Sequence, residues 1–293
     1  VSSLVLANAS GERPLATKPG AYGNPRYSPD GQHVAVTIAA GISTDVWITD
    51  VATGLLTRLT SGGSANDRPE WSPDGSRVLF RTNRDDGSAL WWQAADGSGR
   101  ATPLLANGAE NYFEGVLTPD GSHLVFQVDN RQSDVMMVRV GSDAPAIQIG
   151  SSTAPESQPR ISPDGKWVAY VSAESETQQV VVQPLFGDGA RVQVSVRGGL
   201  EPVWSPDGRR LFYRAEGMFK VAELSYAPTL RVASRADFMR DDYLLSSAPH
   251  AGYDVSPDGR SLLVLKGDPQ QLQVVVNWGS EVRALLRAGA PRQ

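Results

Sequence analysis

The fold of this chain is decided by a short stretch of sequence, Ser72-Pro73-Asp74-Gly75, which recurs along the chain. In each copy, proline fixes φ at about −65°, aspartate hydrogen-bonds the turn backbone, and glycine accepts a positive φ. The stretch therefore predicts a tight turn wherever it occurs. Successive copies are separated by 44, 46, 44, 43 and 51 residues. The six copies, one of which has Thr in first position, begin at Ser28, Ser72, Thr118, Ser162, Ser205 and Ser256.

The residues around each turn predict four short strands per repeat. One strand ends at the tetrad, as in residues 68–71, and an apolar strand such as residues 77–80 follows it. Third and fourth strands are represented by residues 45–48 and 56–59. Alternating apolar and polar residues and β-branched side chains favour strands. A period of about 40–45 residues with four strands per unit is typical of a β-propeller.

A single repeat of this kind cannot bury its own faces, and closing the repeats into a ring solves that problem. We therefore expect an all-β, six-bladed β-propeller with four-stranded antiparallel blades, as one domain over residues 1–293. Residues 3–8 and 11–15 resemble a third and a fourth strand that lack the first two. We expect one or both of them to join the last blade and close the ring.

The segments beyond the fifth tetrad carry three further expectations. The long last gap comes from an insertion at residues 231–249, which predicts a surface loop near one mouth of the channel. Residues 272–277 predict a further strand of the sixth repeat. Residues from about 280 to 288 predict a short C-terminal helix.

The composition limits the classes of partner and of site. The net charge is −5, from 27 basic and 32 acidic residues, and no dense run of Lys and Arg occurs, so we expect no nucleic-acid partner. The absence of cysteine excludes disulfides, thiolate zinc sites and cysteine nucleophiles. No apolar stretch reaches the length of about 18 residues that a membrane-spanning helix needs. We expect a monomer.

Five runs of sequence carry a family resemblance: Gly23-Asn24-Pro25-Arg26, Glu201-Pro202-Val203-Trp204-Ser205-Pro206-Asp207-Gly208, Leu211-Phe212-Tyr213-Arg214, Gly252-Tyr253-Asp254-Val255-Ser256-Pro257-Asp258-Gly259 and Val275-Val276-Asn277-Trp278. They resemble the WD40-like units of TolB-type propellers, and more closely the propeller region that follows bacterial serine/threonine protein kinases. The resemblance covers essentially the whole chain. It implies a sensor-type module that binds a ligand or a partner.

The N-terminus bears on where such a module would be located. The chain begins at Val1 without an initiator Met or an intact signal peptide, so we expect a processed or excised piece. No kinase motif occurs within it. If the chain is the C-terminal part of a membrane-anchored kinase, the resemblance implies an extracytoplasmic location.

The residues before each tetrad are the candidate site residues, because the first strand of every blade lines the central channel. Alternate residues of a strand point the same way, and the apolar residue directly before each tetrad packs between blades. The positions one and three before that residue should then face the channel. The nearer ring consists of Arg26, Glu70, Val116, Arg160, Val203 and Asp254. The farther ring consists of Asn24, Arg68, Glu114, Gln158, Glu201 and Gly252.

Two interpretations of these rings stay open. In the first, arginines and carboxylates only neutralise each other around a hydrated pore. In the second, the rings form a ligand or metal site at the channel mouth. Arg26, Arg68, Arg160 and Gln158 would then contact a small-molecule ligand or a protein partner, or oxygen ligands from several blades would bind Ca²⁺. The candidate ligands are Glu114, Glu201, Asn24, Glu70 and Asp254.

A bound cation would also permit catalysis, because it polarises a carbonyl or phosphoryl oxygen. Six-bladed propellers of the lactonase and paraoxonase kind use a channel calcium in this way, which is a resemblance of fold alone. His250 is then the candidate general base. The sequence thus favours a ligand- or partner-binding module with a polar channel. The alternative function is a calcium-dependent hydrolase of lactones, esters or phosphotriesters with its site at the channel mouth.

Overall fold

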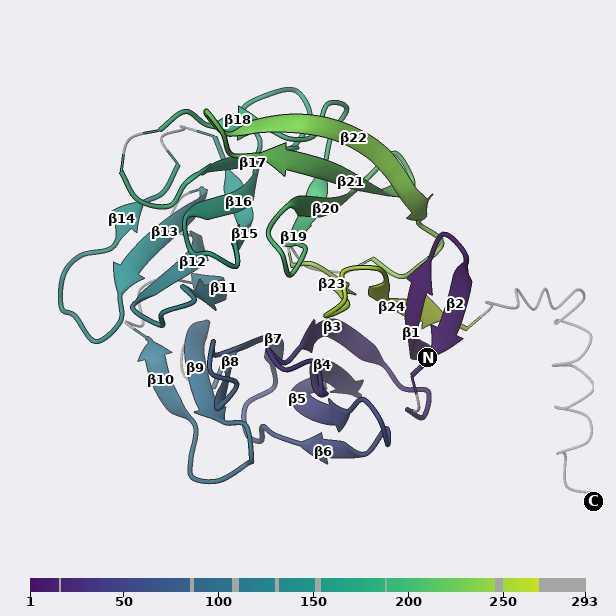
Figure 1. Ribbon diagram of the computed structural model, residues 1–293. Helices are drawn as coiled ribbons and strands as arrows, with labels where there is room; N and C mark the ends of the chain where they lie inside the picture. The colour runs from purple at the N-terminus through teal and green to yellow at the C-terminus, as the bar shows by residue number, and fades with distance from the viewer. Residues whose placement is uncertain are drawn as a thin grey trace, which may run out of the picture.

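Six four-stranded antiparallel sheets stand around a common centre in the computed structural model (Figure 1). The structure describes residues 1–15, 17–84, 87–106, 111–129, 132–150, 154–187, 189–245 and 250–268. The prediction of an all-β, six-bladed propeller is confirmed. The described ranges contain no helix, and therefore none that could span a membrane. The predicted strand at 272–277 and the predicted helix at 280–288 lie outside the described residues.

Blades 1 to 5 each use four consecutive strands, ordered from the centre outward. Blades 1 and 2 consist of β3 (Tyr22–Tyr27), β4 (His33–Ala40), β5 (Ser43–Asp50), β6 (Leu56–Arg58), β7 (Asn66–Trp71), β8 (Arg77–Thr82), β9 (Ala89–Ala94) and β10 (Thr102–Leu105). Blades 3 and 4 consist of β11 (Asn111–Leu117), β12 (His123–Asp129), β13 (Ser133–Arg139), β14 (Ile147–Gln148), β15 (Glu156–Ile161), β16 (Trp167–Ser172), β17 (Gln179–Pro184) and β18 (Val192–Gln193). Blade 5 consists of β19 (Leu200–Trp204), β20 (Arg210–Ala215), β21 (Met218–Ser225) and β22 (Arg231–Arg240).

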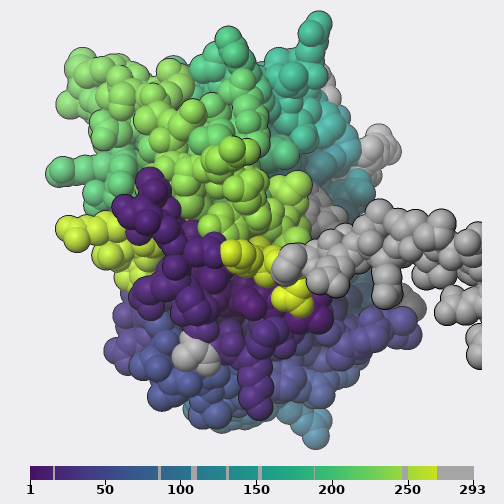
Figure 2. Space-filling view, turned by 90° about the vertical axis from the view of Figure 1, so that its right-hand side faces the viewer, coloured from purple at the N-terminus to yellow at the C-terminus, as the bar shows by residue number. Residues whose placement is uncertain are grey.

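The sixth blade joins the two ends of the described chain. Its inner strands are β23 (Asp254–Val255) and β24 (Leu262–Gly267), and its outer strands are β1 (Ser2–Asn8) and β2 (Gly11–Pro14). The register of β1 on β24 runs from Ser2 opposite Gly267 to Ala7 opposite Leu262. Figure 2 shows the purple N-terminal residues packed against the yellow residues of this blade. Two N-terminal strands therefore close the ring, which the sequence left open between one strand and two.

The apolar core lies between the blades. Each of the six hydrophobic clusters combines buried residues of two adjacent blades, and together the clusters fill all six junctions. At the first junction, Val46 and Ile48 of blade 1 pack with Val78 and Phe80 of blade 2. Because each face needs a neighbouring blade, the closure by β1 and β2 completes the burial of the whole core.

The tetrads form identical turns that join the first and second strands. In the second blade the hydroxyl of Ser72 donates to Asp74 Oδ1 at 2.6 Å and accepts the N–H of Arg77 at 2.9 Å. The backbone of Ser72 also bonds Arg77 and Gly75. The hydrogen bond from Ser72, together with those from Ser76, lowers the pKa of Asp74 to about 2. The serine or threonine hydroxyl is paired in the same way in all six turns.

The tetrads also interlock around the ring. A Cβ built on Gly31 would lie 2.4 Å from Cγ of Pro257 in the preceding blade, which is too close for any side chain. The proline of the preceding tetrad also lies within 4 Å of such a Cβ at Gly75, Gly165, Gly208 and Gly259. The tetrad glycine therefore serves two purposes, since it supplies a positive φ and lets the neighbouring proline pack against the turn.

The insertion at residues 231–249 differs from its prediction. Residues 231–240 form β22, the outermost strand of blade 5, so the prediction of a loop is wrong for this part. Phe238 and Met239 pack against the apolar cluster between blades 5 and 6, which gives the segment a reason to pair as a strand. Figure 1 shows β22 following β21 along the outside of the ring. Residues 246–249 lie outside the described part of the chain.

We predict that Ser72→Ala lowers the free energy of unfolding by about 1–3 kcal/mol, because the N–H of Arg77 loses its side-chain acceptor, the buried hydroxyl of Ser72, and Asp74 loses a donor. Urea denaturation of the purified protein measures the change. The control is Ser76→Ala, which removes an exposed hydroxyl bonded to the same aspartate and should cost at most about 0.5 kcal/mol. Equal losses in the two variants would contradict this account of the turn.

We predict that a disulfide across the closure stabilises the ring. Ser3 of β1 lies opposite Lys266 of β24, and the chain has no cysteine of its own. In the double variant Ser3→Cys with Lys266→Cys, oxidation should raise the free energy of unfolding by about 2–4 kcal/mol, since the crosslink restricts the unfolded chain. Thermal denaturation with and without reductant measures the difference. If the oxidised form is no more stable than the reduced form, separation of β1 from β24 does not limit the stability of the ring.

Candidate functional site

Four of the innermost strands contain a bulge at a proline. In β3 the pairing with β4 shifts between Gly23 and Arg26, and φ of Asn24 is 49°. The bulge lets the ladder skip Pro25, which has no N–H to donate. The same left-handed backbone occurs at Arg68, Gln158 and Glu201, each directly before a proline. A positive φ in such residues costs about 1–3 kcal/mol and persists only where the surroundings hold it. All four belong to the farther predicted ring.

Five side chains from five blades meet at the centre of the ring, and we call them the central cluster: Arg26, Glu70, Glu114, Arg160 and His250. Arg26 Nε donates to Glu70 Oε1 at 2.8 Å, and Arg160 Nη2 lies 3.2 Å from the same oxygen. Arg160 Nη1 donates to Glu114 Oε2 at 3.3 Å. The structure thus brings together residues of both predicted rings, and it adds His250 from the loop before β23.

His250 is fully buried between an arginine and a glutamate. Burial, followed by the charges of Arg26 and Arg160, holds its pKa well below the ordinary value, so its ring is neutral. Arg26 Nη2 lies 3.0 Å from Nε2 and can only donate, so Nε2 accepts. The ring proton must then be on Nδ1, which donates to Glu114 Oε2 at 2.6 Å. Both nitrogens are engaged, and the predicted role of general base stays a prediction that would require one of these contacts to open.

Glu114 lies at the deepest point of the cluster and is fully buried. Its Oε2 receives bonds from His250 and Arg160, whereas its Oε1 has no hydrogen-bond partner among the described residues. Burial raises the pKa of Glu114 to about 7, and the charge of Arg160 opposes this change. A carboxyl group of this kind changes its charge near neutral pH.

A second buried network ties Glu201 to the insertion. Arg214 Nε lies 3.2 Å from Glu201 Oε2, and Arg214 Nη1 bonds both oxygens of Asp241 at 3.0 and 2.9 Å. The N–H of Gly252 also donates to Glu201 Oε2, and the N–H of Glu201 donates to Gln158 Oε1. The sequence analysis did not include Arg214 and Asp241 among the candidate site residues, since neither lies on an innermost strand.

The remaining predicted residues form hydrogen bonds with groups outside the central cluster. Arg68 is buried and donates to the carbonyl of Phe113. Asp254 accepts the N–H groups of Tyr27 and Val255, and burial raises its pKa. Asn24 accepts a bond from the hydroxyl of Thr37 at 3.4 Å.

The candidate calcium ligands are therefore distributed over separate contacts. Within the described ranges, no group of three or more His, Asp or Glu side chains is placed to hold a metal ion. Glu70 and Glu114 face guanidinium groups, and Glu201 faces the guanidinium of Arg214. The calcium site stays a prediction.

A pocket of about 330 Å³ opens at the tetrad side of the channel, and we call it the mouth pocket. Its charged residues are Arg26, Glu70, Arg160 and Asp254, two of each sign, so their charges balance. The pocket also includes apolar side chains such as Ile161 and Trp204. The tetrad prolines in its lining are Pro29, Pro163, Pro206 and Pro257.

We predict that Glu114 makes stability depend on pH near neutrality. Because its folded pKa lies above the value of 4.5 that an unperturbed glutamate has, the folded protein binds this proton more tightly, and stability falls as pH rises from about 4.5 through 7. Glu114→Gln keeps the shape and removes the titration. The free energy of unfolding of the wild type, relative to this variant, should be about 1–3 kcal/mol more favourable at pH 5 than at pH 8. Urea denaturation at both pH values tests this, and a pH-independent difference would contradict it.

Relatives of known sequence match part of the chain. A protein of Agrobacterium fabrum, Uncharacterized protein Atu1656, is 28% identical over 158 residues, which are 50% of this chain and 53% of that protein. The Tol-Pal system protein TolB of Francisella tularensis subsp. holarctica (strain OSU18) is 26% identical over 198 residues, which are 64% of this chain and 45% of the relative. The chain thus spans about half the length of the curated relatives it matches.

A solved structure agrees with the ring architecture. A protein from Agrobacterium tumefaciens, provisionally described as TolB, superimposes with a TM-score of 0.69 and 16% identity over 92% of this chain and 99% of that one. At this identity the likeness shows the fold alone. None of these matches tests the resemblance to kinase-attached propellers, which stays a prediction.

The family follows from the sequence match together with the fold. The family model PD40, described as the TolB beta propeller domain, matches residues 2–153. This span is more than half of the chain, and it runs from β1 through the first three blades of the ring. The chain therefore belongs to the TolB beta propeller domain family.

Proposed function

We propose that this chain is a partner-binding propeller module, and that the mouth pocket receives a segment of a protein partner. The observation that carries the proposal is the pocket itself, about 330 Å³ at the centre of one face, with charged groups and apolar walls. Its volume falls in the range of about 300–1,000 Å³ that ligand sites occupy.

The polarity of the mouth pocket favours a polypeptide over a simple ion. Two guanidinium groups and two carboxylates balance in charge, so the pocket offers donors and acceptors together. A peptide backbone presents N–H and C=O groups in equal numbers and can use both. The prolines and aromatic side chains of the pocket supply apolar surface for its side chains.

The rigidity of the surroundings also supports recognition. Arg26 donates to the carbonyls of Pro25 and Tyr253 as well as to Glu70, so its position is fixed from three sides. Groups that are already oriented lose little conformational entropy when a ligand binds. A relative of this chain is named as a protein of the Tol-Pal system, which accords with a role in an assembly.

The alternative function, a calcium-dependent hydrolase, stays a prediction. Its candidate base, His250, bonds Arg26 and Glu114, and no described contact favours a nucleophile or a bound water. The mouth pocket therefore supports the partner-binding proposal, whereas the hydrolase is supported by the resemblance of its fold to lactonase-type propellers.

We predict that Pro163→Trp, which places a large ring in the mouth pocket, weakens peptide binding by at least about tenfold, or about 1.4 kcal/mol. Peptides selected from a random display library on the wild-type protein provide the ligands, and isothermal titration calorimetry measures their affinity. Glu70→Gln should also weaken them, because it removes one of the two carboxylates of the pocket.

The matched control is Pro119→Trp. Pro119 has the same place in its tetrad and packs against Gly165 as Pro163 packs against Gly208, but it does not line the mouth pocket. Affinity for the selected peptides should stay within about twofold of wild type. If the selected peptides bind Pro163→Trp, Pro119→Trp and Glu70→Gln with the same affinity as the wild type, the mouth pocket is not their binding site.

A further inference from the structure

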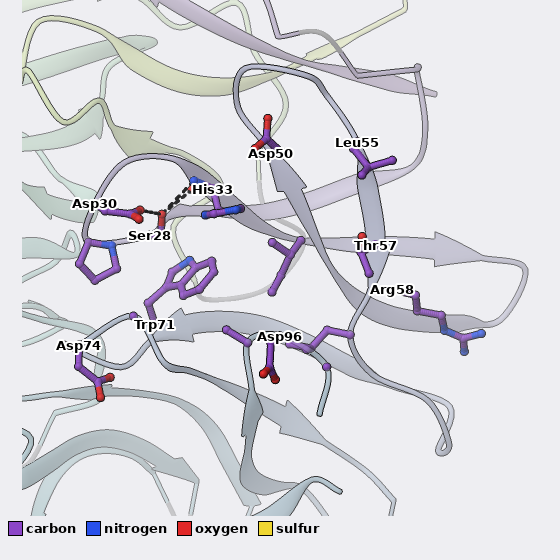
Figure 3. Close-up of a pocket in the computed structure, with 16 residues that line it drawn as sticks. Ser28, Asp30, His33, Asp50, Leu55, Thr57, Arg58, Trp71, Asp74 and Asp96 are labelled. Carbon is purple, nitrogen blue, oxygen red and sulfur yellow. Dashed lines mark hydrogen bonds between the residues drawn. The ribbon is translucent and has the colours of Figure 1, made fainter. Parts of the chain in front are cut away.

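A large cavity lies away from the channel, between blades 1 and 2, and we call it the blade 1–2 groove. Its volume is about 580 Å³. Figure 3 shows Trp71 in the middle of this groove, with Asp30, Asp50, Asp74 and Asp96 around it. The groove therefore combines an aromatic centre with a rim of carboxylates.

The wall of the groove is apolar and partly open to solvent. Ile48, Leu55 and Leu59 line it, and Leu55 is 69% exposed. Trp71 is held in place because its Nε1 donates to the carbonyl of Arg26 at 3.1 Å. A fixed indole beside exposed aliphatic side chains offers a surface on which a flat apolar or delocalised group can stack.

The charge of the groove is negative. Four aspartates line it against one arginine, Arg58, whose Nη2 is bound to Asp45 at 2.6 Å. In Asp30 and Asp50, all hydrogen bonds from described residues go to Oδ1, so Oδ2 remains available. The Ser28 hydroxyl and the Thr53 N–H, respectively, hold the pKa of these carboxyls below the usual range, so both are ionised at neutral pH.

In the next groove around the ring a guanidinium does stack on an indole, although that tryptophan belongs to a third strand and Trp71 belongs to a first strand. Between blades 2 and 3 a cavity of about 500 Å³ contains Arg77, whose guanidinium lies over the ring of Trp92 at 4.3 Å. In blade 1 the tetrad position of Arg77 is taken by His33, whose ring is 6.5 Å from that of Trp71. Among the described residues no arginine lies over Trp71, so the chain supplies no guanidinium of its own here.

We propose that the blade 1–2 groove binds an arginine side chain of a partner polypeptide. The planar guanidinium can stack on Trp71 and donate in pairs to the free carboxylate oxygens of Asp30 and Asp50. The aliphatic part of the arginine packs against the wall that Leu55 exposes. A neutral side chain would leave the carboxylates without a counter-charge.

The groove adjoins the mouth pocket, since Ser28 and Pro29 line both. One extended partner segment could therefore occupy both sites on the same face of the ring. The other residues of the two sites differ, and the groove is acidic whereas the charges of the mouth pocket balance. Binding of arginine in the groove can therefore be tested independently of the mouth pocket.

The probe is the blocked peptide acetyl-Gly-Gly-Arg-Gly-Gly-amide, and its matched control replaces arginine by citrulline, a neutral group of the same shape. Indole N–H signals of the seven tryptophans are followed by two-dimensional NMR, and the Trp71 signal is identified by its loss in Trp71→Phe. We expect the arginine peptide to shift the Trp71 signal saturably, with a dissociation constant at least tenfold lower than that of the citrulline peptide.

The double variant Asp30→Asn with Asp50→Asn should weaken binding of the arginine peptide at least tenfold, because the asparagine Oδ1 can still accept the turn hydrogen bonds while the charge is removed. Asp242→Asn, at an exposed carboxylate outside the groove, should leave the affinity unchanged. Pro163→Trp and Glu70→Gln in the mouth pocket should also leave it unchanged. Equal binding of the two peptides, a Trp71 signal that does not shift, or equal effects of the groove variant and Asp242→Asn would each overturn the proposal.

Discussion

Burial between adjacent blades is the interaction on which the rest of this structure depends. Every hydrophobic cluster of the described core is shared by two blades, so no blade can be dry on both faces unless the ring is complete. The ring is completed by β1 and β2, which bring the start of the chain onto β24. Because β1 and β24 are far apart in the sequence, most of the chain must lose conformational entropy before their pairing stabilises the fold. This is characteristic of folds dominated by long-range contacts.

The tetrad turns pack against one another and form much of one face of the ring. Each turn is fixed internally by its serine or threonine hydroxyl, and at five junctions its glycine packs against the proline of the preceding turn. The turns therefore hold the inner ends of the blades at a constant spacing. The mouth pocket and the blade 1–2 groove both open beside these turns, so the element that makes the fold regular also builds the surface on which recognition is proposed.

The centre of the ring is polar but is not an open row of independent charges. Hydrogen bonds connect Arg26 with Glu70 and Arg160 with Glu114, and the neutral His250 links a guanidinium to a carboxylate. Removing such charges from water is costly unless they are paired, which explains why the arginines and glutamates lie opposite each other. Two buried atoms of the cluster, Glu114 Oε1 and Arg160 Nε, lack a hydrogen-bond partner among the described residues, and the pKa of Glu114 is raised to about 7.

The number of blades, the four strands of each blade and the turns could be predicted from the amino-acid sequence, because they follow from local residue preferences repeated six times. The sequence also identified Arg26, Glu70, Glu114 and Arg160 as residues near the axis, since strand periodicity places them there. It did not predict that residues 231–240 form β22, nor that Asp241 reaches Glu201 through Arg214, because these contacts join residues remote from the repeat pattern. The pairing of the charges and the positions of the cavities became visible only in the folded ring. Both depend on how closely neighbouring blades approach, and six similar repeats do not reveal how their junctions differ.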